Sequence, residues 1–157
     1  PEDEIVRKDS KVWYLPHHPV INPNKDKLRI VFDCAAVSKG HSLNSAVYQG
    51  PDLTSKLIGV LLRFRLGKIA LMADVKAMFH QVKVMDCDKD MLRFLWWKNG
   101  NITTQAKVCR MTVHLFGGTW SPSACAFALK KTVKDFGHEY GDETKYTILN
   151  SFYVDDC

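Results

Sequence analysis

The sequence lacks several features that define whole classes of protein. No apolar run approaches the roughly 20 residues that a membrane-spanning helix requires. Five cysteines are present, but none of them forms a C-x-x-C pair. An odd number of cysteines without metal-ligand spacing suits free thiols in a reducing compartment better than a disulfide framework. The sequence also has no internal repeat and no low-complexity linker.

The N-terminus resembles neither a signal peptide nor a natural start. Pro1-Glu2-Asp3-Glu4 is acidic and contains no methionine, whereas a secretory signal opens with basic residues and then an apolar stretch. We therefore expect the chain to be a fragment of a longer protein.

The composition is that of an ordinary globular domain with a basic excess. Hydrophobic residues make up 46% and charged residues 25% of the 157 residues, which favours one folded domain. The 22 basic and 17 acidic residues give a net charge of +5. This balance favours an anionic partner such as nucleic acid, although many basic domains bind none.

Periodicity predicts a mixed order of strands and helices. Residues 28–33, 68–74 and 146–154 are predicted strands, and each ends on or next to an aspartate. Residues 91–97 and 102–114 are two further β-rich runs. The turn between them, residues 98–101, contains an Asn99-Gly100 pair that favours a type I′ hairpin.

Two helices are predicted between these strands. The first runs from a cap at Asp52 to a stop at Gly67, and the second opens with Ser121 as the cap and Pro122 as the first helical residue. The order predicts an α+β domain with a mostly antiparallel sheet and helices on one face.

Three carboxylates stand at the ends of predicted strands. If the strands that end at Asp74 and Asp155-Asp156 were neighbours, the carboxylates would converge and repel one another until a hard cation such as Mg²⁺ bound. Two such ions about 4 Å apart activate an attacking hydroxyl and stabilise a leaving phosphate oxygen. The spacing does not prove that the strands adjoin, and strand-end aspartates also serve as turn residues or caps.

Four ordered motifs resemble those of reverse transcriptases. Tyr153-Val154-Asp155-Asp156 is similar to the family's aromatic-x-Asp-Asp hairpin, and residues 73–79, Ala-Asp-Val-Lys-Ala-Met-Phe, to its first catalytic motif. Residues 29–33 resemble the fingers strand that begins with a triphosphate-binding arginine, and residues 116–122 the segment that opens the palm helix. Phe116-Gly117 before Ser-Pro, with residues 92–96 upstream, is most like the Bel/Pao group of LTR retrotransposons.

The resemblance implies a polymerase palm-type sheet plus part of the fingers. Within a single fragment of residues 1–157, residues 1–66 and 90–114 would be fingers-like, and residues 67–89 and 115–157 would belong to the palm. The thumb and the RNase H domain of the family would be absent. We therefore expect little or no polymerase activity from this chain alone.

The same resemblance implies roles for single residues. Asp74, Asp155 and Asp156 would be the catalytic carboxylates and the ligands of two Mg²⁺ ions, with Mn²⁺ as a substitute. The deoxynucleoside triphosphate would contact Arg29, Val75, Phe79, Phe116 and Gly117. The nucleic acid would contact Tyr153, Gly118, Ser121 and Pro122.

Simpler alternatives exist for several of these residues. Phe79 resembles a steric gate against a ribose 2′-hydroxyl, but phenylalanine after a strand usually packs in a core. Gly117 and Gly118 would let the backbone approach a base pair, or would only form a turn. Phe116 stands where retroviral enzymes carry a glutamine, which puts that nucleotide contact in doubt. The lysines at 130, 131 and 134 either face template phosphates or form a solvated helix surface.

The expected function is therefore RNA-directed DNA synthesis as part of a retrotransposon polyprotein. The partners would be an RNA or DNA template–primer, deoxynucleoside triphosphates and the rest of the polyprotein, without a membrane. The location would be intracellular, in cytoplasmic virus-like particles or in the nucleus. Two alternatives are an inert remnant that only binds nucleic acid, and another two-metal phosphoryl-transfer enzyme such as a nuclease or cyclase.

Overall fold

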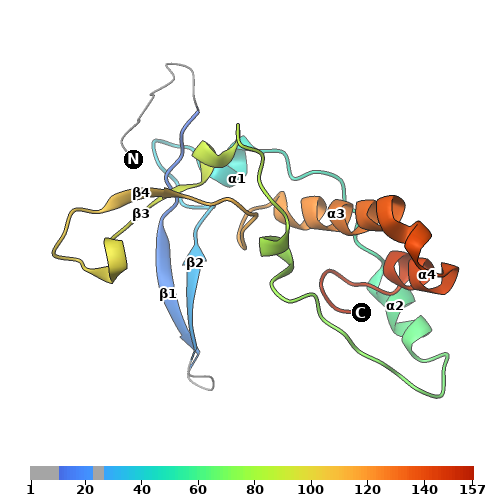
Figure 1. Cartoon of the computed structure of the whole chain (residues 1–157). Helices are drawn as coiled ribbons and strands as arrows, with labels where there is room; N and C mark the ends of the chain where they lie inside the picture. The colour runs from blue at the N-terminus through green and yellow to red at the C-terminus, as the bar shows by residue number, and fades with distance from the viewer. Residues whose placement is uncertain (1–10, 23–26) are drawn as a thin grey trace. The chain divides into compact units, whose positions relative to one another are not determined.

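A computed structural model describes residues 11–22 and 27–157 (Figure 1). The acidic start, residues 1–4, lies outside the described residues. The described part is mixed α+β, with four α-helices and two separate two-stranded antiparallel sheets. The chain divides into two compact units, which are Pro1–Val47 with Lys83–Gly118, and Tyr48–Val82 with Thr119–Cys157.

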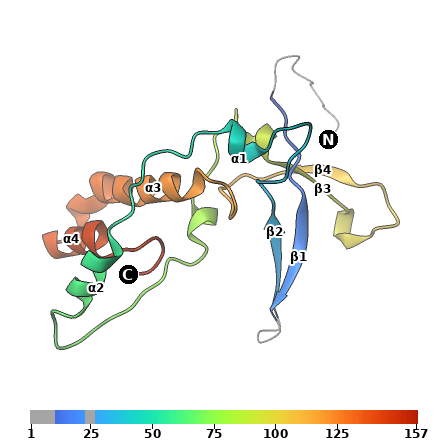
Figure 2. The same ribbon diagram turned by 180° about the vertical axis from the view of Figure 1, so that it is seen from behind.

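The first unit contains both sheets. β1 (His17–Asn22) pairs antiparallel with β2 (Lys27–Phe32), with His17 opposite Phe32, and Figure 2 shows the two strands side by side along their length. The strand predicted at 28–33 is thus confirmed to within one residue at each end. A short helix, α1 (Leu43–Ala46), follows with a capping box between Ser42 and Ser45.

The second sheet is shorter than the sequence predicts. β3 (Arg93–Trp96) pairs antiparallel with β4 (Lys107–Arg110), and short 3-10 turns lie at Lys89–Leu92 and Lys98–Gly100. Asn99 and Gly100 have φ values of +53° and +71°, and Asn101 N–H donates to the Lys98 carbonyl at 3.1 Å. A turn therefore forms at Asn99-Gly100, but it lies within residues 97–106, which separate the two strands. The tight type I′ hairpin is thus wrong, and the predicted β-runs at 91–97 and 102–114 are too long.

An aromatic cluster joins the two sheets of the first unit. The ring of Phe32 in β2 lies 5.1 Å from that of Phe94 in β3, in an edge-to-face arrangement. His17 lies 5.5–5.8 Å from the rings of Phe32, Phe94 and Trp96. Such aromatic pairs stabilise by about 0.5–1.5 kcal/mol beyond the area that they bury. The buried apolar side chains of this unit are Leu15, Cys34, Leu43, Leu92 and Leu115.

The side chain of Asp90 ties β3 to β4. It accepts from Arg93 Nε at 3.0 Å and from Arg110 Nη1 at 3.1 Å. The hydrogen bond from Arg93 is the main reason that the pKa of Asp90 lies below its usual value. Since Asp90 is only partly exposed, this pair contributes more than an ordinary surface ion pair.

The second unit is mainly helical. Its helices are α2 (Leu57–Phe64), α3 (Ser121–Phe136) and α4 (Asp142–Asn150), with 3-10 turns at Met78–Gln81 and Gly137–Glu139. The prediction of α3 is confirmed with a shift of one residue, since Trp120 is the N-cap and Gly137 the C-cap. The helix predicted from Asp52 begins later, because the Asp52 carboxylate accepts from the Thr54 N–H and forms a turn instead.

Two predicted strands of this unit are wrong. Residues 146–150 form the end of helix α4. Asp142 and Glu143 in its first turn complement the helix dipole. The β-propensity of Tyr146, Thr147 and Ile148 led instead to the prediction of a strand. Residues 68–73 are exposed and form no strand. Within 68–75, the backbone hydrogen bonds to a neighbouring segment are confined to residues 73–75. None of the helices in the described ranges is long and apolar enough to cross a membrane.

We predict that Gly117→Ala destabilises the first unit. Gly117 has a φ of +97°, and an added Cβ would lie 2.8 Å from the Phe32 carbonyl oxygen. Strain of this kind costs on the order of 1–3 kcal/mol, which urea denaturation would measure as a lower free energy of unfolding. Gly141→Ala is the matched control, since its φ is −65° and an added Cβ would have no heavy atom within 4 Å. An equal effect of both substitutions would contradict the close approach.

Candidate functional site

The segment that carries two of the carboxylates is a tight turn. Tyr153 N–H donates to the Asp156 carbonyl at 2.8 Å, and Asp156 N–H donates to the Tyr153 carbonyl at 3.2 Å. Val154, the first central residue of the turn, has a φ of +59°. A positive φ is unusual for a β-branched residue and costs on the order of 1–3 kcal/mol. Other contacts of this turn must therefore hold it in place.

Backbone hydrogen bonds join this turn to the segment around Asp74. Ala73 and Cys157 exchange two bonds, of 3.1 Å from Ala73 N–H and 2.8 Å from Cys157 N–H. Val75 N–H donates to the Asp155 carbonyl at 2.9 Å. Asp74 and Asp156 form an antiparallel bridge between these bonds. The convergence that the sequence left open is thus present in the second unit.

The register decides which carboxylates face each other. Asp74 and Asp156 form a non-hydrogen-bonded pair, in which opposite Cα atoms lie about 4.5 Å apart and the side chains share a face. Asp155 is the second central residue of the turn, and its carbonyl accepts from the Val75 N–H. The backbone register therefore sets Asp156, rather than Asp155, directly opposite Asp74.

The charge at this site is accessible to solvent. Asp74 and Asp156 are exposed, and Asp155 is half-buried. Like charges directly opposite each other across two strands are destabilising, so the pair favours a cation. Hard carboxylate oxygens are the ligands that Mg²⁺ prefers, and Mg²⁺ is usually held by one or two carboxylates together with substrate phosphates.

The oxygen atoms at this site are therefore of the type that Mg²⁺ binds. They belong to two carboxylates at opposed backbone positions. Across the described residues, no group of three or more histidine, cysteine, aspartate or glutamate side chains is arranged to hold a metal ion. A site built here would thus draw on the Asp74–Asp156 pair and complete its coordination with substrate and water.

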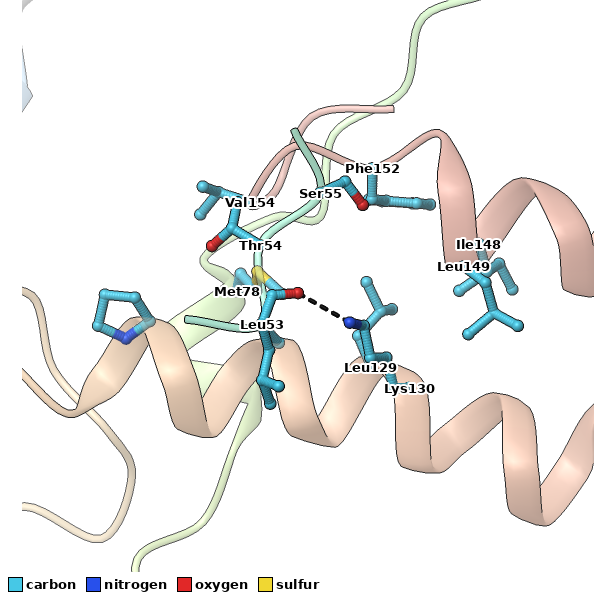
Figure 3. Close-up of a pocket in the computed structure, with 12 residues that line it drawn as sticks. Leu53, Thr54, Ser55, Met78, Leu129, Lys130, Ile148, Leu149, Phe152 and Val154 are labelled. Atoms are coloured by element: carbon cyan, nitrogen blue, oxygen red, sulfur yellow. Dashed lines mark hydrogen bonds between the residues drawn. The ribbon is translucent and has the colours of Figure 1, made fainter. Parts of the chain in front are cut away.

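A small apolar pocket lies behind the turn (Figure 3). Val154 lines it together with Met78, which is buried, and with residues of α3 and α4. The cavity has a volume of about 30 Å³, so the side chains fill most of the space. This packing of Val154 offsets part of the strain in its backbone.

A lysine of α3 holds the loop that closes the pocket. Lys130 Nζ donates to the Leu53 carbonyl at 2.8 Å, and Figure 3 shows this bond between two residues that line the pocket. Gly50, earlier in the same loop, lies so close to α3 that an added Cβ would be 2.6 Å from Ser123 Oγ. Lys131, next along the helix, pairs with Asp135. Both lysines therefore have partners in the protein, whereas one alternative from the sequence was a fully solvated helix surface.

The remaining candidates of the second unit lie close to these elements in sequence. Phe79 is half-buried in the 3-10 turn Met78–Gln81, which follows Ala77 with a φ of +51°. The N–H of Val75 is used by the Asp155 carbonyl, so Val75 holds the two segments together rather than offering this N–H to a phosphate. Ser121 is fully buried, Pro122 lines the pocket, and Tyr153 is 38% exposed.

The other candidates belong to the first unit. Arg29 is exposed in β2, opposite Val20 of β1. Phe116 is 51% exposed and Gly118 is buried. The carbonyl of Gly117 accepts from Asn44 Nδ2 at 3.0 Å, so this glycine makes a close backbone contact inside the unit. The structure therefore pairs the backbone segment of Asp74 with that of Asp155 and Asp156, and places Arg29 and residues 116–118 in the first unit.

Sequence reasoning missed the residues that build the site without bearing charge. Ala73 and Cys157 supply the bonds that align the carboxylates, and Met78 and Leu53 support Val154 from below. Burial raises the pKa of the Cys157 thiol, which favours its neutral form beside the carboxylates. The only signal in the sequence was the apolar character of residues 69–73 and 152–154, which indicated two packed segments but not their register.

The sequence was compared with protein-family models and with curated proteins. No protein-family model matches the sequence, and no curated protein matches it significantly. The candidate site therefore stands on its residues and its geometry.

We predict that Asp74→Asn and Asp156→Asn each raise the free energy of unfolding in the absence of divalent cations. Each substitution removes the like-charge repulsion of the opposed pair, which is worth roughly 0.2–1 kcal/mol for a cross-strand pair. Thermal denaturation in chelator at neutral pH measures the change. Glu139→Gln, at an exposed carboxylate in the same unit, is the control with the same charge change. Destabilisation by both aspartate variants would show that the carboxylates do not repel each other.

Proposed function

We propose that this chain is the nucleotidyl-transfer part of an RNA-directed DNA polymerase with a palm-type architecture. The observation that carries the proposal is the backbone pairing of residues 73–75 with 155–157. It unites two motifs that lie far apart in the sequence and that each resemble a catalytic motif of reverse transcriptases. The basic excess of the chain is consistent with a nucleic-acid partner.

The carboxylates are the proposed cation ligands. Asp74 and Asp156 lie opposite each other, and Asp155 directly precedes Asp156 in the turn. When bound, two divalent cations would lower the pKa of a primer 3′-hydroxyl and stabilise the leaving pyrophosphate oxygen. The protein contributes by fixing the carboxylate positions beforehand, so that little reorganisation accompanies the reaction.

The other residues would bind and select the nucleotide. Arg29 carries a planar guanidinium suited to bidentate contact with a triphosphate. Phe79 would occupy the space of a ribose 2′-hydroxyl and so favour deoxynucleotides. Phe116 and Gly117 would line the nucleotide site, and Gly118, Ser121, Pro122 and Tyr153 the nucleic acid. Gly118 and Ser121 are buried, so in this proposal they would shape the backbone beneath the template without touching it.

The first test is cation binding by this chain. Mn²⁺ titration followed by electron paramagnetic resonance should detect binding that Asp74→Asn and Asp156→Asn each weaken about tenfold or more, because each removes one of few ligands. Asp155→Asn tests the third carboxylate. An equal loss of Mn²⁺ affinity would show that the Asp155 side chain binds the same ion. Glu139→Gln is the control and should leave binding unchanged. Equal binding by wild type and all three aspartate variants would refute the cation site.

The second test is primer extension on an RNA template with Mg²⁺, in a chain that also carries the thumb. Asp155→Asn and Asp74→Asn should each lower the rate about 100-fold or more, since removal of groups that only orient metal ligands already costs 10–100-fold. Inactivity of the unsubstituted protein with template–primer binding intact would instead favour the inert nucleic-acid-binding remnant.

The selectivity of this polymerase gives a further prediction. In the same assay, Phe79→Val should raise incorporation of ribonucleotides relative to deoxynucleotides, because a smaller side chain removes the clash with the 2′-hydroxyl. The ratio of kcat/KM for the two nucleotides measures the effect. A ratio unchanged by the substitution would assign Phe79 to core packing.

A further inference from the structure

Helix α2 turns one narrow face to the rest of the second unit. None of its residues is buried, and its three leucines and its isoleucine are exposed. The half-buried residues are Gly59, Val60 and Arg63, which share one face because residues three and four apart are neighbours on a helix. Figures 1 and 2 both show α2 beside α4. Apolar burial therefore contributes little to the attachment of α2.

Arg63 makes the polar contact of this face. Its Nη2 donates to the carbonyl of Asn150, the last residue of α4. The guanidinium lies over Gly59, one turn earlier in α2, where an added Cβ would be 3.3 Å from Nη1. The lack of a side chain at Gly59 thus leaves the room in which the Arg63 guanidinium reaches α4.

The carbonyl that Arg63 binds lies at the negative end of α4. The last carbonyls of a helix have no partner within it and carry partial negative charge. Ser151 N–H donates to the Thr147 carbonyl at 2.8 Å, and Asn150 Nδ2 donates to the Tyr146 carbonyl at 2.9 Å. The last turn of α4 contains no basic residue, so Arg63 supplies from α2 the positive charge that this helix end favours.

The same contact joins the two chain segments that enter the carboxylate site. From Arg63 the chain continues to Ala73, and from Asn150 it continues to Cys157. Ala73 and Cys157 exchange two backbone hydrogen bonds. The entropy cost of closing a loop rises with the number of residues in it. With Arg63 bound to Asn150, the pairing of Ala73 with Cys157 closes only the short segments between these four residues.

We propose that Arg63 is a positioning residue for the carboxylate site, which it holds through the end of α4. Phe152 and Val154 line the same pocket as Ile148 and Leu149 of α4, so the turn packs on the helix end that Arg63 fixes. The positive φ of Val154 persists only where the surroundings hold it. Loss of the Arg63 contact therefore loosens the turn, and the carboxylates with it, before the rest of the unit.

Arg63 thereby raises the affinity for a cation without touching it, a consequence that rests on the proposed function. The apparent affinity of a ligand falls with the fraction of molecules in the binding-competent state. The competent state here is the register that sets Asp74 opposite Asp156. Arg63 increases the population of that register, whether or not a cation is present.

Amide hydrogen exchange of this chain, measured by NMR in chelator, tests the positioning role. Arg63→Met removes the donor and keeps a long apolar side chain. It should speed exchange at Ala73, Val75 and Cys157 about tenfold, because a hydrogen bond from a charged group is lost. Amides in the middle of α3 should exchange as in the unsubstituted chain. Arg63→Lys retains a charged donor and should keep exchange within about threefold of the unsubstituted chain.

Two further variants separate the contact from the charge. Arg65→Met is the matched control, since Arg65 is exposed and its Nη1 donates to the Leu61 carbonyl of α2 itself. Gly59→Leu keeps Arg63 and favours the helix, but its side chain occupies the room of the guanidinium. Gly59→Leu should therefore speed exchange at the site, and should add nothing to Arg63→Met because both remove one contact.

Each outcome bears on a separate part of the proposal. Equal acceleration at the site and in α3, acceleration by Arg65→Met, or no effect of Arg63→Met overturns the positioning role. Mn²⁺ titration of the same variants tests its consequence, since Arg63→Met should weaken binding about tenfold, and unchanged binding overturns that consequence. Local acceleration by Arg63→Met in a chain that binds no Mn²⁺ supports the positioning role and counts against the cation site.

Discussion

The backbone pairing between residues 73–75 and 155–157 is the constraint on which the candidate site depends. Three hydrogen bonds fix the register of two segments that are separated by most of the second unit. That register puts the Asp74 and Asp156 carboxylates opposite each other in spite of their repulsion. The protein thus uses neutral backbone groups to hold charged side chains in a position that the charges alone would avoid. The proposed cation site rests on this opposition of two carboxylates.

The backbone of the turn at residues 153–156 is strained, and contacts outside the turn stabilise it. The positive φ of Val154 is unfavourable for a β-branched residue, but its side chain packs against the pocket between Met78, α3 and α4. Lys130 closes this pocket by holding the loop at Leu53. Strain of this kind persists only where surrounding contacts fix the conformation. The apolar packing and the charged edge are therefore parts of one structure.

The elements that could be predicted from the sequence are those with local signals. Helix α3 has proline near its start and Gly137 at its end, and β2 is a compact β-branched run. The prediction failed at residues 146–154, where β-propensity competes with an acidic helix start, and at residues 68–73, where the apolar pattern of a buried strand occurs without a partner strand. In both places long-range contacts decide the conformation, and a single sequence does not contain them.

The candidate site likewise contains residues with a local signal in the sequence and residues without one. The three aspartates were found because each stands beside an apolar segment, but their register depends on Ala73 and Cys157, which carry no chemical signal. The roles of Arg29, Phe79 and Phe116 came only from resemblance.

The most direct measurement of the central claim is amide hydrogen exchange by NMR across residues 73–75 and 153–157. The pairing predicts slow exchange at Ala73, Val75 and Cys157, whose N–H groups are bonded across the two segments. It predicts faster exchange at Asp74, for whose N–H the described residues supply no backbone acceptor. Fast exchange at all four amides would contradict the pairing and with it the convergence of the carboxylates.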